Sequence, residues 1–358
     1  MIKIKTSQLK NKFQLLNSLA TRASLPILNN ILIYPEKKIA KAVATDLETT
    51  IILPIDAKCE EKMLLPSQAL TKIVNLAQED IFIEQKENIA TINLENTKFE
   101  LALPNANEFP TLPSLETKSF INIQAQDLKI GINKVIFATE KTRGDYYSPL
   151  NNVNFIFDSS QLQMTASNRV ILAVANIPCS GSIESKNCLV PTPPLLLLSK
   201  LLANQEINLS ITESTIIFKT DEFLIISQLT DQKFPDIASV LEEKSKIHVS
   251  VLKDSFIDAL IKASIAAEEK VILEFNEDKI TVSSNSDLGS VVSTIDIKTS
   301  EGADLLPLKF GFNRIYLSNI IKRLGETIHI GLLDPRSPVY LNTDEALKYV
   351  IMPLELHD

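Results

Sequence analysis

Glycine is scarce in this sequence, with 8 residues in a chain of 358, and tryptophan is absent. No two glycines stand in a GxGxxG or GxxxxGK arrangement, which excludes the usual nucleotide-cradling loops. The three histidines, His248, His329 and His357, are isolated from one another and lack the spacing of an HExxH-type metal site. A GxSxG turn is also missing. The sequence therefore predicts no catalytic residues, no metal site and no cofactor.

Cysteine and long apolar runs are also limited. Cys59, Cys179 and Cys188 are an odd number at irregular spacing, which fits neither a disulfide framework nor a zinc site. No apolar run approaches the roughly 20 residues that a membrane-spanning helix needs. The first residues after Met1 alternate between polar and apolar, without the charged and apolar regions of an export signal. We expect a cytoplasmic protein, and its length favours two or three domains.

What the sequence does contain is a threefold internal repeat. Apolar residues at intervals of three and four predict a first amphipathic helix in each copy, at residues 7–22, 125–139 and 252–267. A second helix is predicted in each copy, at 66–78, 191–203 and 312–325. Proline at positions 66 and 191 suits a first helical turn, and Gly325 suits a helix end.

Between the predicted helices the apolar residues alternate with period two, which indicates half-buried strands, as at 89–94 and 99–103. Two short sequence features also recur at similar intervals. A polar pair follows an apolar run in each copy, at 45–46, 167–168 and 284–285, and a proline lies near the end of each copy, at 110, 235 and 353. We therefore expect an α+β protein of three similar domains, each with two helices packed on antiparallel sheet. The predicted boundaries are 1–118, 119–243 and 244–358.

The formal net charge is −8, but the predicted helices carry the opposite sign. Their basic residues are Lys10, Lys12, Arg22, Lys72, Lys129, Lys134, Lys200, Lys253, Lys262, Arg314, Lys322 and Arg323. The acidic residues in the same spans are only Asp127, Asp254 and Asp258. Lysines on the solvent-exposed face of a single helix usually interact only with water. The same excess of positive charge in six helices favours a surface that faces DNA. Such phosphate contacts would be loose and independent of sequence.

Five short segments in register with the repeat resemble one family. They are 25–30 (LPILNN), 44–48 (ATDLE), 233–236 (KFPD), 311–313 (GFN) and 349–354 (YVIMPL). The chain is similar to the bacterial DNA polymerase III beta subunit, the replication sliding clamp, over its whole length. This resemblance implies the DNA clamp fold, a head-to-tail homodimer closed into a ring around double-stranded DNA, and no catalysis. It also implies the DNA polymerase III alpha subunit, a clamp loader, and other polymerases and repair proteins as partners.

The resemblance assigns DNA contacts to Arg22 and to a loop that contains Arg143, Tyr146 and Tyr147. This loop aligns imperfectly, and the two tyrosines could instead pack against Pro149. Together with the helix charges, the predicted DNA-binding residues are Lys10, Lys12, Arg22, Lys72, Lys129, Lys134, Arg143, Tyr146, Tyr147, Lys200, Lys253, Lys322 and Arg323.

The family's partner site is an apolar pocket that accepts a short linear motif. Carried over to this chain, it consists of Leu150, Ser167, Val170, Leu172, Pro235, Val240, Val350, Ile351, Met352, Pro353 and Leu354. This chain departs from the family there, because residues 167–172 read SNRVIL where TDGHRL is common, and Glu355 replaces a basic or neutral residue. We expect a differently shaped pocket with a more acidic rim. For the dimer interface, the resemblance implies Phe99 and Leu101 on one side and Ile261 and Ile265 on the other.

Two alternatives stay open at this point. The first is a monomeric DNA-binding scaffold that uses the basic helices as an open patch. The second is an enzyme that holds a metal with acidic pairs such as Asp46 and Glu48, or Asp287. Because the other copies have Asn168 and Asn285 in place of Asp46, a turn role for Asp46 is the favoured interpretation.

Overall fold

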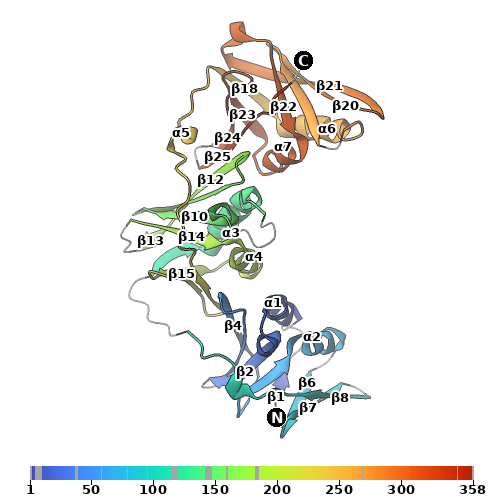
Figure 1. Cartoon of the computed structure of the whole chain (residues 1–358), viewed down its shortest axis with the longest axis vertical. Helices are drawn as coiled ribbons and strands as arrows, with labels where there is room; N and C mark the ends of the chain where they lie inside the picture. Colours follow the sequence, from blue (N-terminus) through green and yellow to red (C-terminus); the bar gives the residue numbers. More distant parts are fainter. Residues whose placement is uncertain are drawn as a thin grey trace. The chain divides into compact units, whose positions relative to one another are not determined.

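The computed structural model describes residues 2–4, 10–36, 39–57, 59–78, 80–94, 96–113, 120–141, 147–158, 160–181, 185–267, 269–344 and 346–356. Its elements follow one order three times along the chain: a strand, a helix, four strands, a helix and three strands (Figure 1). We call these the first, middle and third repeats. The middle repeat has one additional strand, the two-residue β13. A short helix, α5, lies between the middle and third repeats. The predicted α+β fold of three similar domains is confirmed.

The bounds are as follows. The first repeat contains β1 (Ile2–Ile4), α1 (Lys10–Ala20), β2 (Asn30–Glu36), β3 (Ile39–Thr45), β4 (Thr49–Ile55), β5 (Met63–Pro66), α2 (Ser67–Leu76), β6 (Ile81–Lys86), β7 (Ile89–Leu94) and β8 (Thr97–Ala102). The middle repeat contains β9 (Ile121–Gln124), α3 (Ala125–Val135), β10 (Asn152–Phe157), β11 (Gln161–Ser167), β12 (Ile171–Pro178), β13 (Ser180–Gly181), β14 (Lys186–Pro191), α4 (Thr192–Leu201), β15 (Glu206–Ile211), β16 (Thr215–Lys219) and β17 (Leu224–Gln228). After α5 (Ala238–Leu241), the third repeat contains β18 (Ile247–Leu252), α6 (Lys253–Ala263), β19 (Lys270–Phe275), β20 (Lys279–Ser286), β21 (Gly289–Glu301), β22 (Leu308–Asn313), α7 (Arg314–Ile321), β23 (Thr327–Leu332), β24 (Val339–Asp344) and β25 (Leu347–Ile351).

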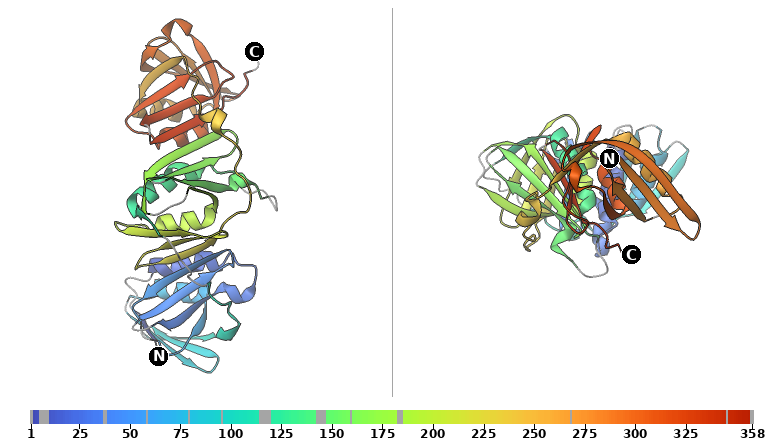
Figure 2. Two further views of the ribbon diagram at one scale, coloured as in Figure 1. Left: turned by 90° about the vertical axis from the view of Figure 1, so that its left-hand side faces the viewer. Right: turned by 90° about the horizontal axis from the view of Figure 1, so that it is seen from above.

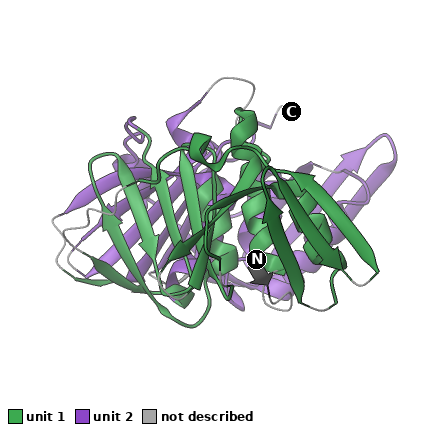
Figure 3. Ribbon diagram, turned by 90° about the horizontal axis from the view of Figure 1, so that it is seen from below, with its two compact units in different colours: residues 1–126, 179–183, 193–230 green, residues 127–178, 184–192, 231–358 purple. Residues whose placement is uncertain are grey.

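The chain divides into two compact units (Figure 3). Unit 1 comprises residues 1–126, 179–183 and 193–230, and unit 2 comprises 127–178, 184–192 and 231–358. The division passes through the middle repeat, so each unit combines one end repeat with part of the middle one.

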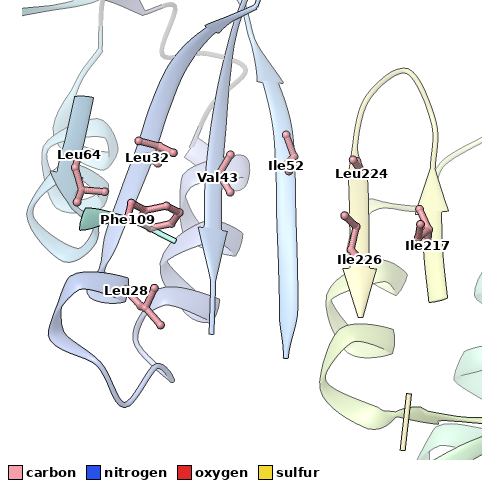
Figure 4. Packing of buried hydrophobic residues seen from close by; sticks show 9 residues of the cluster. All are labelled: Leu28, Leu32, Val43, Ile52, Leu64, Phe109, Ile217, Leu224 and Ile226. Carbon is pink, nitrogen blue, oxygen red and sulfur yellow. The ribbon is translucent and has the colours of Figure 1, made fainter. Parts of the chain in front are cut away.

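Unit 1 is built on a nine-stranded sheet in the order β13-β9-β15-β16-β17-β4-β3-β2-β5. Strand β17 of the middle repeat pairs antiparallel with β4 of the first, with Leu224 opposite Ile52 and Ile226 opposite Thr50. An apolar cluster spans this junction, where Ile52 faces Leu224 and Ile226, and Phe109 covers the neighbouring strands (Figure 4). The pairing and the cluster together make the two repeats continuous within unit 1.

Helices α1 and α2 lie on the sheet of the first repeat (Figures 1 and 2). Helix α1 buries Phe13, Leu16 and Ala20, which belong to the face that the apolar spacing predicts. The buried Thr71 hydroxyl on α2 donates to the Phe13 carbonyl oxygen at 3.3 Å, which fixes one helix against the other. A second sheet, β1-β6-β7-β8, completes the repeat, and β8 lies at its edge.

Unit 2 contains a twelve-stranded sheet in the order β14-β10-β11-β12-β25-β24-β23-β18-β21-β20-β19-β22. Its junction between repeats is the antiparallel pair β12 and β25, with Leu172 opposite Val350 and Ala173 opposite Tyr349. Helix α3 packs so closely on β11 and β12 that a side chain at Gly131 would overlap Met164. Helix α6 covers β18, β20 and β21 and contacts α7.

The six predicted helices are present, and each is shorter than the apolar pattern indicated. Phe312 and Asn313 belong to strand β22, and the Asn313 side chain caps α7 by accepting from the backbone N–H groups of Ile315 and Tyr316. Residues Ile136–Ala138 continue α3 as a tighter 3-10 turn. None of the helices in the described residues combines the length and hydropathy of a membrane span.

Candidate functional site

An apolar cavity of about 220 Å³ lies in unit 2 beside the junction of β12 and β25. Its walls come from a 3-10 turn (Pro149–Asn151), the turn between β11 and β12, the segment that leads into α5, and the end of β25. The lining residues are Leu150, Ser167, Arg169, Val170, Ile171, Leu172, Phe234, Pro235, Ile237, Val240, Val350 and Met352. A concave apolar site of this kind can receive the apolar side chains of a short peptide.

The turn from Ser167 to Ile171 shapes the mouth of the cavity. The Asn168 side-chain oxygen accepts from the N–H groups of Val170 (3.1 Å) and Ile171 (2.8 Å), and the Ser167 hydroxyl donates to the Ile171 carbonyl at 2.8 Å. These bonds fold the chain back tightly and leave Arg169 in the left-handed region, at φ 74°.

The first repeat contains the same turn at residues 45–49. Asp46 takes the place of the asparagine and accepts from the N–H groups of Glu48 (3.1 Å) and Thr49 (2.7 Å), while Leu47 adopts φ 78°. The carboxylate of Asp46 therefore accepts hydrogen bonds within its own turn. This is the turn role that the sequence predicted, because the other copies have asparagine at the same place. No group of three His, Cys, Asp or Glu side chains suited to a metal ion occurs among the residues with described positions.

Tyr340 packs behind the cavity, against two of its lining residues, Leu172 and Val350, and is not itself a lining residue. It packs with Leu172, Val174 and Val350, and its hydroxyl is directed at the carbonyl oxygens of Val240 (3.1 Å) and Glu242 (3.2 Å). Burial raises the pKa of Tyr340, and the nearby Glu243 and Glu242 carboxylates raise it further. The phenol stays protonated and holds α5 as one wall of the site.

The structure brings most of the predicted pocket residues together. Leu150, Ser167, Val170, Leu172, Pro235, Val240, Val350 and Met352 line the cavity. Ile351 does not, because it is fully buried in the sheet. Pro353 and Leu354 also lie outside the lining, and the Leu354 N–H bonds to the Gly311 carbonyl at 2.7 Å.

Sequence reasoning missed four lining residues: Arg169, Ile171, Phe234 and Ile237. Phe234 stands inside the KFPD segment, so that segment could have indicated it. Arg169 could have been found from the comparison of SNRVIL with TDGHRL, because the arginine stands at a different position in the two segments. Ile171 and Ile237 read as ordinary core residues, and no pattern in the sequence distinguishes them.

The predicted DNA-binding residues differ in how freely they reach solvent. Arg22, Lys72, Lys200 and Lys322 are exposed on or beside their helices. Lys129 and Lys134 on α3 are partly exposed. Tyr147 is exposed, and its hydroxyl donates to the Asn152 side chain at 3.2 Å. Arg143 and Tyr146 lie outside the described residues.

Three predicted lysines donate to backbone carbonyls within their own unit. Lys10 bonds to Asn75 at the end of α2 (3.1 Å), and Lys12 bonds to Pro54 (2.9 Å). Lys253 bonds to the carbonyls of Lys322 (3.0 Å) and Leu324 (2.8 Å), just after α7. Burial lowers the pKa of Lys12, an effect that Glu222 partly offsets. Two of these contacts place a positive charge at the negative end of a helix dipole.

Arg323 is engaged more fully than any of these lysines. Its Nε donates to the Asn133 carbonyl at 3.0 Å, its Nη1 donates to the Asn319 carbonyl at 2.7 Å, and its guanidinium carbon lies 4.0 Å from the centre of the Phe137 ring. Burial lowers the pKa of Arg323, and Tyr349 partly offsets that effect. These contacts join α7 to the end of α3.

The residues predicted for the dimer interface belong to different units, Phe99 and Leu101 to unit 1 and Ile261 and Ile265 to unit 2. Phe99 and Leu101 are half-buried on β8 and alternate with exposed residues along this edge strand. Ile261 and Ile265 are highly exposed at the end of α6, and Ile265 reaches 73%. Val292 on β21 is also an exposed apolar residue of the third repeat, at 66%.

Sequence comparison shows what the whole chain is similar to. Sequence models of the DNA polymerase III beta subunit match in three consecutive parts: the N-terminal domain at residues 1–113, the central domain at 122–236 and the C-terminal domain at 238–355. A beta sliding clamp from Bacillus subtilis (strain 168) is 28% identical over 369 aligned residues, which cover 96% of each chain.

Solved structures give the same result for the fold. A DNA polymerase sliding clamp from Bacillus subtilis superposes with a TM-score of 0.89 at 25% identity, over 99% of each chain. The beta subunit of DNA polymerase III from Thermotoga maritima superposes with a TM-score of 0.90 at 23% identity, over the full length of both chains.

Proposed function

The chain belongs to the DNA polymerase III beta subunit family, the beta sliding clamps, and from this membership we propose how its own residues perform the function of that family. It is a DNA sliding clamp and has no catalytic role. Its task is to hold a polymerase on DNA by encircling the duplex. A monomeric scaffold is not favoured, because the likeness to sliding clamps covers all three repeats.

The observation that carries the proposal is the way in which successive repeats join. The last strand of the middle repeat, β17, pairs with β4 of the first, and the last strand of the third repeat, β25, pairs with β12 of the middle one. Strands β4 and β12 hold the same place in their repeats. The same rule would pair β8, the last strand of the first repeat, with β21 of a third repeat.

Both of these strands offer an edge for such pairing. Strand β8 pairs only with β7 among the described strands. In β21, residues 289–296 pair with β20, while β18 begins to pair only at Ile297. Unpaired strand edges invite addition of another strand. We propose that β8 of one copy pairs with β21 of a second, with Phe99 and Leu101 against the surface of Ile261 and Ile265, and that the reciprocal contact closes a two-chain ring.

For the DNA-facing surface, we propose the exposed basic residues of the helices, with Arg22, Lys72, Lys200 and Lys322 as the main contacts and Lys129 and Lys134 beside them. Four further basic residues would act on DNA mainly through their electrostatic field, because their side-chain N–H groups already donate to backbone carbonyl oxygens. They are Lys10, Lys12, Lys253 and Arg323. Arg143, Tyr146 and Tyr147 stay predictions as DNA contacts. A ring retains DNA by topology, so lysines that touch phosphates loosely suit sliding.

For partners, we propose that the apolar cavity beside β12 and β25 receives a short linear motif. The DNA polymerase III alpha subunit, the clamp loader, and other polymerases and repair proteins would share this one pocket, which explains why it uses a few apolar anchors rather than a specific polar network. We also propose domain boundaries at 1–118, 119–243 and 244–358, and a cytoplasmic location, where the bacterial chromosome is replicated.

The test of this function is topological. The protein is loaded onto nicked circular DNA with its clamp loader and ATP, and the circle is then either left closed or linearised before gel filtration. We expect the protein to stay with the circle and to leave the linear DNA. A matched control is the Phe99→Ala/Leu101→Ala variant, which should leave both forms. Equal retention of the wild-type protein on circle and line would establish direct binding and overturn the ring.

A further inference from the structure

One wall of the apolar cavity is not held in place by its own structure. This wall consists of α5 and the residue before it, from which Ile237 and Val240 line the cavity. Helix α5 has only four residues, and none of them is buried. A single helical turn is not stable by itself, because its formation fixes several residues for very few hydrogen bonds. The position of this wall must therefore be set by contacts with the sheet on which it lies.

Tyr340 on β24 makes the central contact with α5. Its ring packs with Leu172 and Val350, two residues of the cavity lining. Its hydroxyl lies 3.1 Å from the carbonyl oxygen of Val240 and 3.2 Å from that of Glu242. These carbonyl groups stand at the C-terminal end of α5, where they have no partner within the helix. The phenol therefore supplies the donor that ties the end of α5 to the sheet.

The residues that follow α5 are held by the two neighbouring strands. On β23, Gly331 pairs directly with Tyr340, and a Cβ atom at Gly331 would lie 2.4 Å from both Oε1 of Glu243 and Oγ of Ser245. These two side chains therefore lie against backbone that only glycine leaves uncovered. On β25, Nζ of Lys348 lies 3.7 Å from Oε2 of Glu243. We call Tyr340, Gly331, Glu243 and Lys348 the brace.

The brace borders open space as well as packed side chains. Tyr340, Gly331 and Glu243 also line a polar groove of about 590 Å³, whose other lining residues belong to β18, β21, β23 and β24. Closely packed interiors resist displacement, whereas a groove leaves room for side chains to move. A force on α5 from within the cavity is therefore opposed mainly by the polar contacts of the brace.

We propose that α5 is an adjustable wall of the partner cavity, and that Tyr340 is the positioning residue that sets how large an apolar anchor the cavity accepts. This inference rests on the proposed function of the cavity as the site of a short linear motif. A cavity of about 220 Å³ with a mostly apolar lining suits the apolar side chains of a peptide. Apolar pockets separate anchors that differ by one methylene group by roughly 10- to 200-fold. A loosened wall would reduce that selectivity.

The test compares peptides that differ only in the size of one apolar anchor. The probes are labelled synthetic copies of the clamp-binding segment of this organism's own alpha subunit, with Val, Leu or Phe placed at each apolar position in turn. Fluorescence polarisation with the full-length protein gives their dissociation constants. Tyr340→Phe keeps the ring and removes only the hydroxyl. We expect this variant to reduce the preference for the smaller anchor by about two- to tenfold, the range of one lost hydrogen bond.

Hydrogen exchange separates this role from a general loss of stability. The N–H groups of Leu241 and Glu242 are bonded within α5, to the carbonyls of Ile237 and Ala238. Tyr340→Phe should speed exchange at these two amides and leave exchange in β12 and β25 unchanged. An increase spread over all of unit 2 would overturn the inference, because the hydroxyl would then act on overall stability.

Two further variants complete the test. Gly331→Ala should displace the Glu243 and Ser245 side chains and lower the same anchor preference, although it leaves every lining residue of the apolar cavity in place. Tyr316→Phe is the matched control, because this tyrosine lies outside the brace, and it should change neither exchange nor selectivity.

The binding results distinguish the two proposals. An anchor preference that survives Tyr340→Phe, an equal loss of affinity for every anchor, or the absence of any anchor preference in the wild-type protein would overturn the role of Tyr340 and leave the partner site standing. Failure of every peptide to bind the wild-type protein would overturn the proposed partner site itself.

Discussion

The hydroxyl of Tyr349 donates a hydrogen bond to the backbone carbonyl of Lys134 at 2.8 Å, which joins the last strand of the third repeat to the end of α3. The Tyr349 ring is fully buried and meets Phe137 edge to face, with ring centres 5.8 Å apart. Burial raises the pKa of Tyr349, so the phenol stays neutral and continues to donate. Arg323 also contacts this cluster, with its guanidinium carbon 4.0 Å from the centre of the Phe137 ring. This cluster holds the middle and third repeats of unit 2 together beyond their paired strands.

The first prediction concerns this hydrogen bond. Tyr349→Phe keeps the ring but leaves the Lys134 carbonyl without its buried donor, which costs about 1–3 kcal/mol. In a protein of this size, calorimetry should show a thermal transition lowered by several degrees. Tyr316→Phe is the control, because this partly exposed tyrosine lies outside the cluster. An unchanged transition in Tyr349→Phe would contradict the assigned role.

The second prediction separates packing from DNA contact at two neighbouring residues. Arg323→Ala should lower the thermal transition, since it removes two hydrogen bonds and the contact with Phe137, and Arg323→Lys should not restore it because the planar fork is lost. Lys322→Ala, at an exposed position, should leave the transition unchanged and reduce the salt dependence of DNA binding. Weakened DNA binding without any loss of stability in Arg323→Ala would show that Arg323 contacts DNA.

Arg323 also shows what the sequence could not predict. Its place on a basic helix is visible from the residues, but its partners Asn133 and Phe137 lie about 190 positions earlier in another repeat. Helices, hairpins and the turn at Asp46 depend on local spacing, and these were predicted well. The pairing of β17 with β4 and of β25 with β12 depends on which repeat lies beside which, and no local pattern records that. The pocket was predicted from the family resemblance alone, because its residues read as ordinary core.

The third prediction concerns ring closure. Phe99→Ala/Leu101→Ala removes the apolar residues on the free edge of β8, and central apolar anchors of an interface commonly contribute 1–4 kcal/mol each. Sedimentation at low protein concentration should then show a single chain, where the wild-type protein shows two. Ile89→Ala is the matched control, since Ile89 is an exposed residue on β7 of the same sheet. A mass that stays at two chains in the double variant would exclude this edge from the interface.

The fourth prediction concerns partner selectivity. Arg169 stands where the family commonly has glycine, and Glu355 replaces a basic or neutral residue after β25. Partner motifs of this organism should have adapted to those changes. We expect a motif from its own polymerase to bind more tightly than the corresponding motif of a distant bacterium in a fluorescence titration. Equal affinities would show that the altered residues do not influence selection.

The last prediction is a pH dependence that arises from one buried thiol. Cys188 on β14 is buried, and burial raises its pKa from 9.0 to about 12. Below pH 9 the thiol is protonated in both the folded and the unfolded chain, so it does not favour either state. Between pH 9 and 12 the unfolded thiol ionises while the folded one stays protonated. Unfolding then releases a proton, and stability falls with rising pH by up to about 1.4 kcal/mol per unit.

Cys188→Ala removes this dependence. Urea unfolding midpoints measured with reductant at pH 8, 9, 10 and 11 should fall more steeply for the wild-type protein than for the variant, and only above pH 9. The slopes are compared, so any constant loss of stability from the smaller side chain does not matter. Cys59→Ala should give a smaller change, because burial also raises the pKa of Cys59 but its side chain is only partly buried. Parallel curves for the wild-type protein and Cys188→Ala would mean that the folded thiol ionises freely.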